Sequence, residues 1–426
     1  MADIKPFQGL LYNPSVIKDP AKVVAPPYDV ISPDMQDKLY KAHQKNIVRL
    51  ILGKGCKDDN ENNNKYKRAK RELDRWIKED TLVRDKEESL YIHEQIYTNG
   101  SKSMTRTGFF SLMKIEDPAA KIVMPHEKTL ARPKVDRLNL ITEVRANLSP
   151  IFALYNDDKK AISKILKKAA EASDPIISIQ FDGIAHKLWR LSDKKKIDSI
   201  KSAMRDKRIV IADGHHRYEV ARAYRDMTRG TKDFKPNMDY VMVFLTNLSE
   251  PENVTIFSTH RLIRDMSNMD LAAVKGRLAE YFDINDCRDL AELFSSMREN
   301  GRPAEFGVYF GGNSYIKLSL KKDVDAAALI DEDKSPEWKK LDVAILHSFI
   351  IRKLLSLKDS EDNVKYVRDP EDAVRLVDSR SYGIAFLLNP TKPDEVKRVA
   401  LKGDTMPQKS TYFYPKVLTG LVMHRF

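Results

Sequence analysis

The segment that decides the fold, residues 209–219, reads IVIADGHHRYE. Its first residues are apolar and mostly β-branched, and they predict a buried strand over residues 207–212. Asp213 and Gly214 interrupt this pattern, since an Asp-Gly pair is typical of a tight turn. A helix should follow, because apolar residues recur at helical spacing and Gly230 is placed to end it. The predicted buried stripe of this helix consists of Val220, Ala221, Tyr224 and Met227.

The turn before this helix is also the first candidate site. A helix start presents backbone N–H groups without intrahelical partners and a partial positive charge, so it attracts anions. Gly214 would let a ligand approach the backbone, and His215, His216 and Arg217 would line the first turn. We therefore predict that these four residues bind a phosphate group. The alternative is structural, with Asp213 as a simple N-cap and the histidines packed around the helix end.

A second charged cluster lies in residues 125–137, which read PHEKTLARPKVDR. Its basic residues, which could neutralise the charge of a phosphate, are Lys128, Arg132, Lys134 and Arg137. Glu127 or Asp136 could handle a proton or a magnesium ion, and Glu127 is the predicted general base. Asp213 is the alternative base or metal ligand. The alternative for the whole segment is a solvated charged loop without a ligand.

A third candidate segment, residues 406–416, reads MPQKSTYFYPK. Lys409, Ser410 and Thr411 resemble the end of a phosphate-binding P-loop, but the glycines at Walker A spacing are missing upstream. The three residues are therefore predicted to contact phosphate without forming a Walker A site. An aromatic strand with exposed polar residues would explain the segment equally well.

Composition and charge narrow the class of protein. The chain has 426 residues and a formal net charge of +12, which favours phosphate-bearing partners of either small or polymeric kind. Cys56 and Cys287 stand far apart and form no Cys-x-x-Cys pair, so the sequence supports neither a disulfide framework nor a zinc site and favours a reducing compartment. The first residues do not resemble a signal peptide, and the apolar run at 240–248 is shorter than the ~20 residues that span a bilayer. A cytoplasmic protein is expected.

The order of the predicted elements indicates an α/β fold of α+β character. Strands at 90–97 and 107–115 should form a hairpin around Asn99 and Gly100, and long amphipathic helices should follow at 158–172 and 194–204. A second hairpin is predicted within 306–320 and a long helix at 338–357. We place the domain boundary between an N-terminal region, residues 1–265, that carries the Asp-Gly-His-His-Arg segment and a C-terminal α/β region, residues 266–426, that ends in the Lys-Ser-Thr motif.

Several longer motifs occur in a fixed order along the chain. They are PFxGL at 6–10, APPYDVIS at 25–32, PHEKT at 125–129, ADGHHRY at 212–218 and MPxKST at 406–411. Together they resemble a bacterial and archaeal family known as a domain of unknown function, over essentially the whole chain. The Asp-Gly-His-His-Arg element is also similar to the phosphate-binding box of free-serine kinases. This resemblance implies a ParB/sulfiredoxin-like phosphate-binding core with an additional mixed sheet and helices.

The resemblance also implies an activity. We expect a small-molecule phosphotransferase, a free L-serine kinase that makes O-phosphoserine from a pyrophosphate or nucleotide donor with Mg²⁺. Its partners would be the phosphate donor and an amino acid, with neither nucleic acid nor membrane. Sulfinic-acid reduction is not supported, because His215 and His216 stand where sulfiredoxins carry a reactive cysteine. The alternative is a non-catalytic, ParB-like regulatory protein that senses nucleotides or binds nucleic acid.

Overall fold

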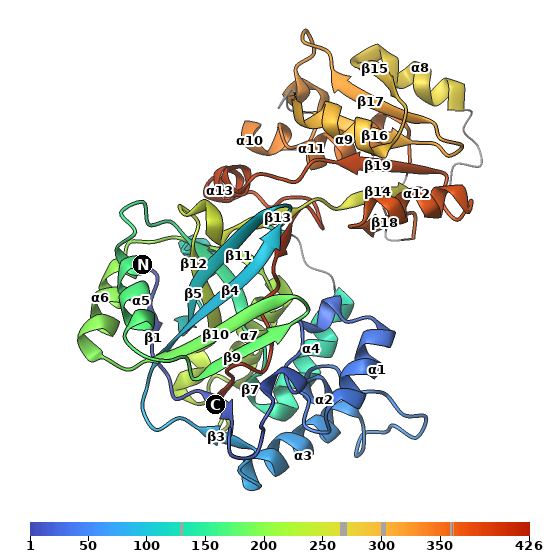
Figure 1. Ribbon diagram of the computed structural model, residues 1–426. Coiled ribbons are helices and arrows are strands. Elements are labelled where there is room, and N and C mark those ends of the chain that lie inside the picture. The colour runs from blue at the N-terminus through green and yellow to red at the C-terminus, as the bar shows by residue number, and fades with distance from the viewer. Residues whose placement is uncertain (128–130, 265–270, 300–303, 358–359, 361) are drawn as a thin grey trace. The chain divides into compact units, whose positions relative to one another are not determined.

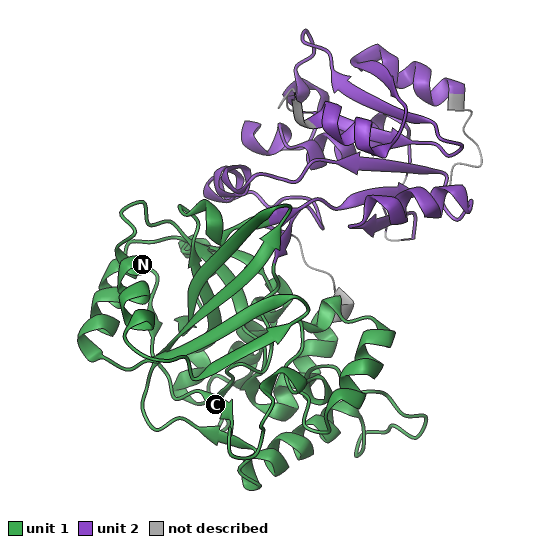
Figure 2. Cartoon of the chain, in the orientation of Figure 1, with its two compact units in different colours: residues 1–125, 129–255, 415–426 green, residues 126–128, 256–414 purple. Residues whose placement is uncertain are grey.

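The computed structural model covers residues 1–426 and describes all of them except 128–130, 265–270, 300–303, 358–359 and 361. The chain forms two compact units, which Figure 2 distinguishes by colour. Unit 1 comprises residues 1–125, 129–255 and 415–426, and unit 2 comprises residues 126–128 and 256–414. Unit 1 is therefore completed by the last residues of the chain, which return to it after unit 2.

A mixed sheet forms the centre of unit 1, which confirms the predicted α/β class (Figure 1). Its strands run in the order β6-β11-β8-β12-β5-β4-β10-β9, with β1 also paired to β5. The pairs β11–β6 and β12–β8 are parallel, and the other pairs are antiparallel. The strands are β1 (Ile4–Lys5), β4 (Leu90–Asn99), β5 (Lys102–Lys114), β6 (Val123–Pro125), β8 (Ile151–Tyr155), β9 (Ile177–Phe181), β10 (Ile184–Leu191), β11 (Ile209–Asp213) and β12 (Tyr240–Asn247).

The predicted hairpin of β4 and β5 is confirmed. Asn99 pairs with Lys102, so the chain turns through Gly100, whose φ of +60° suits glycine. Both strands are longer than the sequence pattern indicated. Because β5 lies between β4 and β12 in the interior of the sheet, its ladder continues beyond the residues with a clear alternation.

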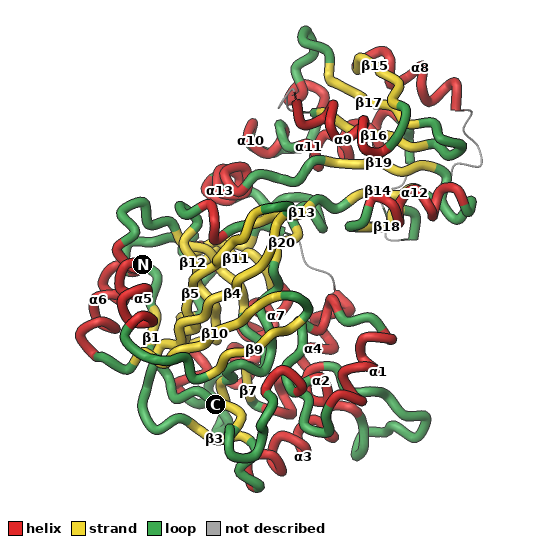
Figure 3. The backbone as a smooth tube through the Cα atoms, viewed as in Figure 1, coloured by secondary structure: helices red, strands yellow, loops and turns green. Residues whose placement is uncertain are grey.

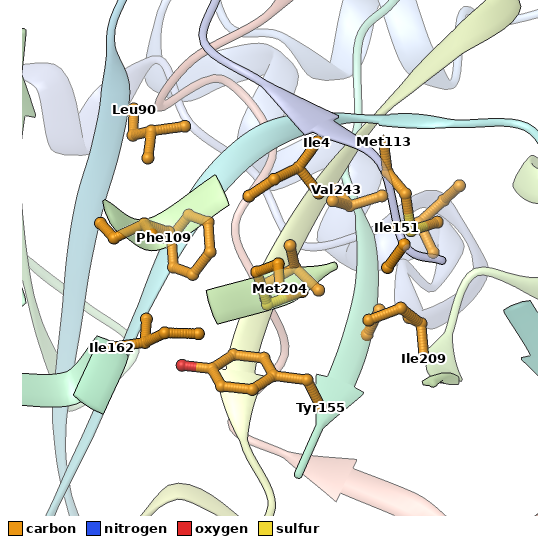
Figure 4. Packing of buried hydrophobic residues seen from close by; sticks show 14 of the residues in the cluster. Ile4, Leu90, Phe109, Met113, Ile151, Tyr155, Ile162, Met204, Ile209 and Val243 are labelled. Carbon is orange, nitrogen blue, oxygen red and sulfur yellow. The ribbon is translucent and has the colours of Figure 1, made fainter. Parts of the chain in front are cut away.

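Helices surround the sheet of unit 1, and Figure 3 shows them outside the strands. The helices are α1 (Pro33–Ala42), α2 (Val48–Ile51), α3 (Lys65–Lys78), α4 (Ala131–Val144), α5 (Ala161–Glu171), α6 (Lys194–Met204) and α7 (His215–Thr228). Helices α5 and α6 place one apolar stripe each against the sheet, where Ile162 and Met204 pack with Phe109 and Tyr155 (Figure 4). Burial of such a side chain contributes about 1.5–3 kcal/mol.

The predicted buried stripe of α7 is correct for Val220, Ala221 and Tyr224 and wrong for Met227, which is 54% exposed. Thr228 is buried in its place, four residues after Tyr224, and its hydroxyl donates to the Tyr224 carbonyl at 2.9 Å. The helix ends at this residue, so Met227 lies in the last turn on the solvent side.

Short elements tie the ends of the chain into unit 1. Strand β21 (His424–Arg425) pairs with β7 (Ala146–Asn147), and β2 (Leu10–Tyr12) pairs with β3 (Leu82–Arg84). Isolated bridges join Ala25 to Thr419 and Leu10 to Met423. The 3-10 helices of the unit are η1 (Pro20–Lys22), η2 (Tyr28–Val30), η3 (Pro118–Ala120), η4 (Pro236–Asp239) and η5 (Pro251–Asn253).

Unit 2 is built on a second sheet with the strand order β15-β17-β16-β19-β14-β18. These strands are β14 (His260–Ile263), β15 (Phe282–Cys287), β16 (Glu305–Tyr309), β17 (Tyr315–Leu320), β18 (Val364–Val367) and β19 (Ile384–Leu388). The remaining strands, β13 (Thr255–Phe257) and β20 (Tyr412–Tyr414), pair with each other. The predicted hairpin within 306–320 is confirmed as β16 and β17. Both cysteines of the chain are free thiols.

The predicted continuous helix at 338–357 is wrong. Helix α10 ends at Lys339, and Leu341 then adopts extended backbone (φ −70°, ψ 133°) that buries its side chain. The chain resumes as α11 and continues as the π-helical segment η7, which ends at Leu354. The helical segments of unit 2 are α8 (Leu271–Tyr281), α9 (Leu290–Glu299), η6 (Ala326–Leu329), α10 (Pro336–Lys339), α11 (Asp342–Ala344), η7 (Ile345–Leu354), α12 (Pro370–Asp378) and α13 (Pro393–Leu401). In the described part of the chain, none of the helices has the length and apolar character needed to span a membrane.

Candidate functional site

The predicted strand, turn and helix around Asp213 are confirmed. Strand β11 ends at Asp213, Gly214 is the N-cap, and α7 begins at His215. Gly214 has a φ of +90°, and a Cβ atom built there would lie 2.9 Å from Cζ of Arg217. Two features therefore favour glycine at this position: its left-handed backbone and the close approach of the Arg217 guanidinium.

Asp213 holds two cations, one on each carboxylate oxygen. Nη2 of Arg217 lies 2.5 Å from Oδ2, and Nζ of Lys416 donates to Oδ1. The side chains of Asp213, Arg217 and Lys416 are 12%, 11% and 13% exposed. Burial by itself would raise the pKa of Asp213, but Lys416 and Arg217 outweigh burial and hold the pKa well below its usual range. The three groups together carry one positive charge in excess.

Two hydrogen bonds hold the guanidinium of Arg217. Its Nη1 donates to the Pro150 carbonyl in the loop before β8, while Nη2 bonds Asp213. Its Nε is buried and has no hydrogen-bond partner among the described residues. A buried cation that is only partly satisfied by the protein is costly, so this side chain is a candidate for a role other than packing.

The carboxylate of Asp213 does not fit the role of a magnesium ligand in this arrangement. Both of its oxygens already accept from cationic donors, so a divalent cation bound there would lie next to the positive charges of Arg217 and Lys416 and be repelled by them. Among the residues that the structure describes, no group of three or more His, Cys, Asp or Glu side chains is arranged to hold a metal ion.

A cavity of about 60 Å³ lies beside Arg217, between α4 and α7. Its polar lining residues are Tyr28, Arg137, Asn147, Ser149 and Arg217, and the remaining walls are apolar. A space of this size can accommodate several water molecules or one small polyatomic group. Burial and the Asp29 carboxylate raise the pKa of Tyr28 to about 12, so its hydroxyl remains protonated at neutral pH.

Arg137, predicted to bind phosphate, is already held by protein groups. Its Nη1 donates to the Ile51 carbonyl at 2.6 Å, its Nε donates to Asp136 at 2.9 Å, and its guanidinium lies 4.0 Å from the centre of the Tyr28 ring. Arg137 therefore connects α4 to Tyr28 in η2 and to the end of α2. Asp136 also accepts from Lys65 at 2.6 Å, so this candidate carboxylate is part of an ion-pair network.

The other predicted residues near α7 have different surroundings. His215 is buried and His216 is half-buried in the first turn. Nζ of Lys134 lies 2.5 Å from Glu219, which joins α4 to α7. Lys128 and the side chain of Arg132 lie outside the described residues.

The remaining candidates form a cluster within unit 2. Oε1 of Glu127 accepts from the backbone N–H of Thr411 at 3.1 Å and from its hydroxyl at 3.0 Å. Nε2 of His126 lies 2.7 Å from the same hydroxyl, and the backbone N–H of Met406 donates to the His126 carbonyl at 2.6 Å. The segments PHEKT and MPxKST, distant in the sequence, are thus paired in the structure, as the parallel bridge between Glu127 and Met406 also shows.

Lys409 contributes its backbone carbonyl to this cluster, and Ser410 closes a local turn. Lys409 has a φ of +55°, and its carbonyl accepts from the buried Arg261 at 2.9 Å. The Ser410 hydroxyl is buried and donates to the Pro407 carbonyl. Arg261 also donates to His347, which gives the loop a rigid support within unit 2.

A family model described as a protein of unknown function, DUF1015, matches residues 4–344. The chain belongs to this family. The matched range includes the turn of Asp213, the PHEKT segment and Tyr28, whereas Lys409 and Lys416 lie beyond it. No curated protein matches the sequence.

Solved structures resemble this DUF1015 chain at low sequence identity. A conserved hypothetical protein from Pyrococcus furiosus has 13% identity and a TM-score of 0.34, covering 73% of this chain and 92% of its own. A free serine kinase in complex with AMP has 13% identity and a TM-score of 0.34, covering 75% and 89%. SbnI from Staphylococcus aureus, truncated at its C-terminus, has 13% identity and a TM-score of 0.34, covering 73% and 85%.

Sequence reasoning missed Lys416 and Tyr28 as members of the cluster around Arg217. Lys416 ends the third candidate segment and Tyr28 lies in the APPYDVIS motif, so both were within segments already noticed. Neither stands in a spacing that predicts proximity to Asp213, because the contacts join parts of the chain that are far apart in sequence.

Proposed function

We propose that the protein is a small-molecule phosphotransferase, a free L-serine kinase that makes O-phosphoserine from a pyrophosphate or nucleotide donor. The observation that carries this proposal is the excess positive charge of Asp213, Arg217 and Lys416 at the start of α7. Charge-assisted bonds and the partial positive charge of a helix start both favour a phosphate at such a place.

Phosphoryl transfer depends mostly on positioning and on stabilising the charge of the transferred group. In the proposed reaction, the serine hydroxyl oxygen forms a bond to the terminal phosphorus of the donor. The bond from that phosphorus to the leaving oxygen breaks, and the hydroxyl proton passes to a general base. Gly214, His215, His216 and Arg217 would hold the donor phosphate, with Lys409, Ser410 and Thr411 as further proposed phosphate-binding residues.

Glu127 is the proposed base. A general base must accept a proton near the working pH, and its efficiency falls as its pKa falls. Two cations hold the pKa of Asp213 well below its usual range and occupy both carboxylate oxygens, so Asp213 is the weaker candidate. We assign Asp213 instead the task of orienting Arg217.

The test is to incubate the purified protein with L-serine and one donor at a time, with and without Mg²⁺. ATP, ADP and pyrophosphate are compared, and O-phosphoserine is measured by mass spectrometry. We expect phosphoserine with at least one donor, and at least a tenfold lower rate for Arg217→Ala at a temperature where that variant is still folded, since a bond to a charged group contributes about 1.5–3 kcal/mol. Donor binding without any phosphoserine would contradict the proposal and support the non-catalytic alternative.

A further inference from the structure

The last residues of the chain return to unit 1 and bring a lysine to the Asp213 cluster. Figure 1 shows this C-terminal segment in red, ending beside β3 and β7. Lys416 is the second residue of the returning segment, and its ammonium bonds Asp213. The position of its side chain therefore depends on how the backbone at residues 415–416 is held.

Two buried residues of the central sheet hold that backbone. Nη1 of Arg106, on β5, donates to the Pro415 carbonyl at 2.7 Å, and Nε2 of Gln95, on β4, donates to the Lys416 carbonyl at 3.0 Å. Arg106 also donates to Oε1 of Gln95 at 3.1 Å and, through Nε, to the Asn253 carbonyl at 2.8 Å. Both side chains are fully buried.

Burying the guanidinium of Arg106 lowers the stability of the folded state. A guanidinium removed from water loses several kcal/mol of solvation, and burial lowers the pKa of Arg106 to about 10. Apolar side chains at these two positions could not donate to the Pro415 and Lys416 carbonyls, so the polar atoms of Arg106 and Gln95 are what hold this backbone. Their hydrogen bonds hold the backbone carbonyls of Pro415 and Lys416 in place.

We propose that Lys416 is a further phosphate-binding residue of the Asp213 cluster and that Arg106 and Gln95 are positioning residues that act through it. This inference rests on the proposed function and adds a residue from the C-terminal segment to the donor site. Without Lys416, the charges of Asp213 and Arg217 cancel and the cluster is neutral. With Lys416, one positive charge remains to balance a phosphate.

The test measures pyrophosphate binding to the full chain by isothermal titration calorimetry, independently of turnover. We expect Lys416→Met to weaken pyrophosphate binding about 10- to 100-fold, the range for loss of one charge-assisted bond. Lys416→Arg should restore most of the affinity, because the charge is kept. Lys195→Met, which removes an exposed lysine of α6, should bind as the unmodified protein does.

The positioning role is tested with Gln95→Met, alone and combined with Lys416→Met. We expect Gln95→Met to weaken pyrophosphate binding when Lys416 is present and to have no further effect when Lys416 is already replaced. In the kinase assay, Gln95→Met should raise the donor KM and leave kcat nearly unchanged. A loss of affinity that is equal in both backgrounds would overturn the positioning role.

The outcomes separate this inference from the proposed function. Unchanged pyrophosphate affinity in a folded Lys416→Met protein would overturn the role of Lys416, even if phosphoserine forms. Lys416-dependent binding of pyrophosphate without phosphoserine from any donor would leave the inference standing and remove the serine kinase. A third outcome is that the unmodified protein binds no pyrophosphate at millimolar concentration and forms phosphoserine only from nucleotides. That result would overturn the assignment of Lys416 to a pyrophosphate site.

Discussion

Replacement of Asp213 by Asn is the most direct perturbation of the charge cluster at the start of α7. The amide is nearly the same size as the carboxylate, so packing should change little. The negative charge disappears, however, and Arg217 and Lys416 remain as two neighbouring cations that are each nearly nine-tenths buried. The substitution therefore isolates the electrostatic contribution of Asp213 to both stability and anion binding.

The expected loss of stability follows from that burial. Removing one partner of a buried ion pair costs about 3–5 kcal/mol, because an uncompensated charge is left behind. The residual exposure of the three side chains places Asp213→Asn near the lower end, about 3 kcal/mol. For a folding unit of this size, that corresponds to a decrease in Tm of roughly 6–12 °C.

An anion should restore much of this stability, because it replaces the missing negative charge. A ligand at a hundred times its Kd stabilises the folded state by about 2.7 kcal/mol. We therefore expect pyrophosphate to raise the Tm of Asp213→Asn by more than it raises that of the unmodified protein. The assay is a thermal melt followed by circular dichroism, across a pyrophosphate titration at constant ionic strength.

The control is Asp198→Asn, which removes an exposed carboxylate of α6 and should change Tm by less than 2 °C or so, as surface substitutions do. Two results would refute the reasoning. An unchanged Tm for Asp213→Asn would show that the ion pairs contribute nothing, and a lowered Tm without recovery in pyrophosphate would show that the cations do not form an anion site.

Three further predictions concern other residues. Glu127→Gln should lower kcat by about 10²–10⁴-fold with little change in donor affinity, measured by steady-state kinetics, and a preserved rate would exclude Glu127 as the base. Gly214→Ala should cost about 1–3 kcal/mol in urea unfolding and weaken donor binding, because its φ of +90° and the contact with Arg217 leave no room for a methyl group. Burial lowers the pKa of His186 to about 4, so between pH 6.5 and pH 4 this histidine is protonated in the unfolded chain but not in the folded chain. The free energy of unfolding, measured by urea unfolding at each pH, should therefore fall as the pH is lowered from 6.5 to 4, and it should fall less steeply in His186→Gln.

Local patterns in the sequence predicted much of the secondary structure correctly. The alternation of β4 and β5, the glycine between them and the apolar stripe of α7 each depend on neighbours a few residues away, where periodicity carries the information. The same reasoning failed at Met227 and at Leu341. Both lie where a helix ends or breaks, and tertiary packing decides such boundaries more than local propensity does.

The candidate site illustrates the same division. The sequence by itself determined that Gly214 to Arg217 begin a helix after a buried strand, because a turn, a glycine and an apolar stripe occur within a few residues. Only the tertiary structure decided that Lys416 neutralises Asp213 from 203 positions away and that Glu127 pairs with Thr411. Charged side chains have no periodicity that reveals their partners, and these contacts depend on the path by which the end of the chain returns to unit 1.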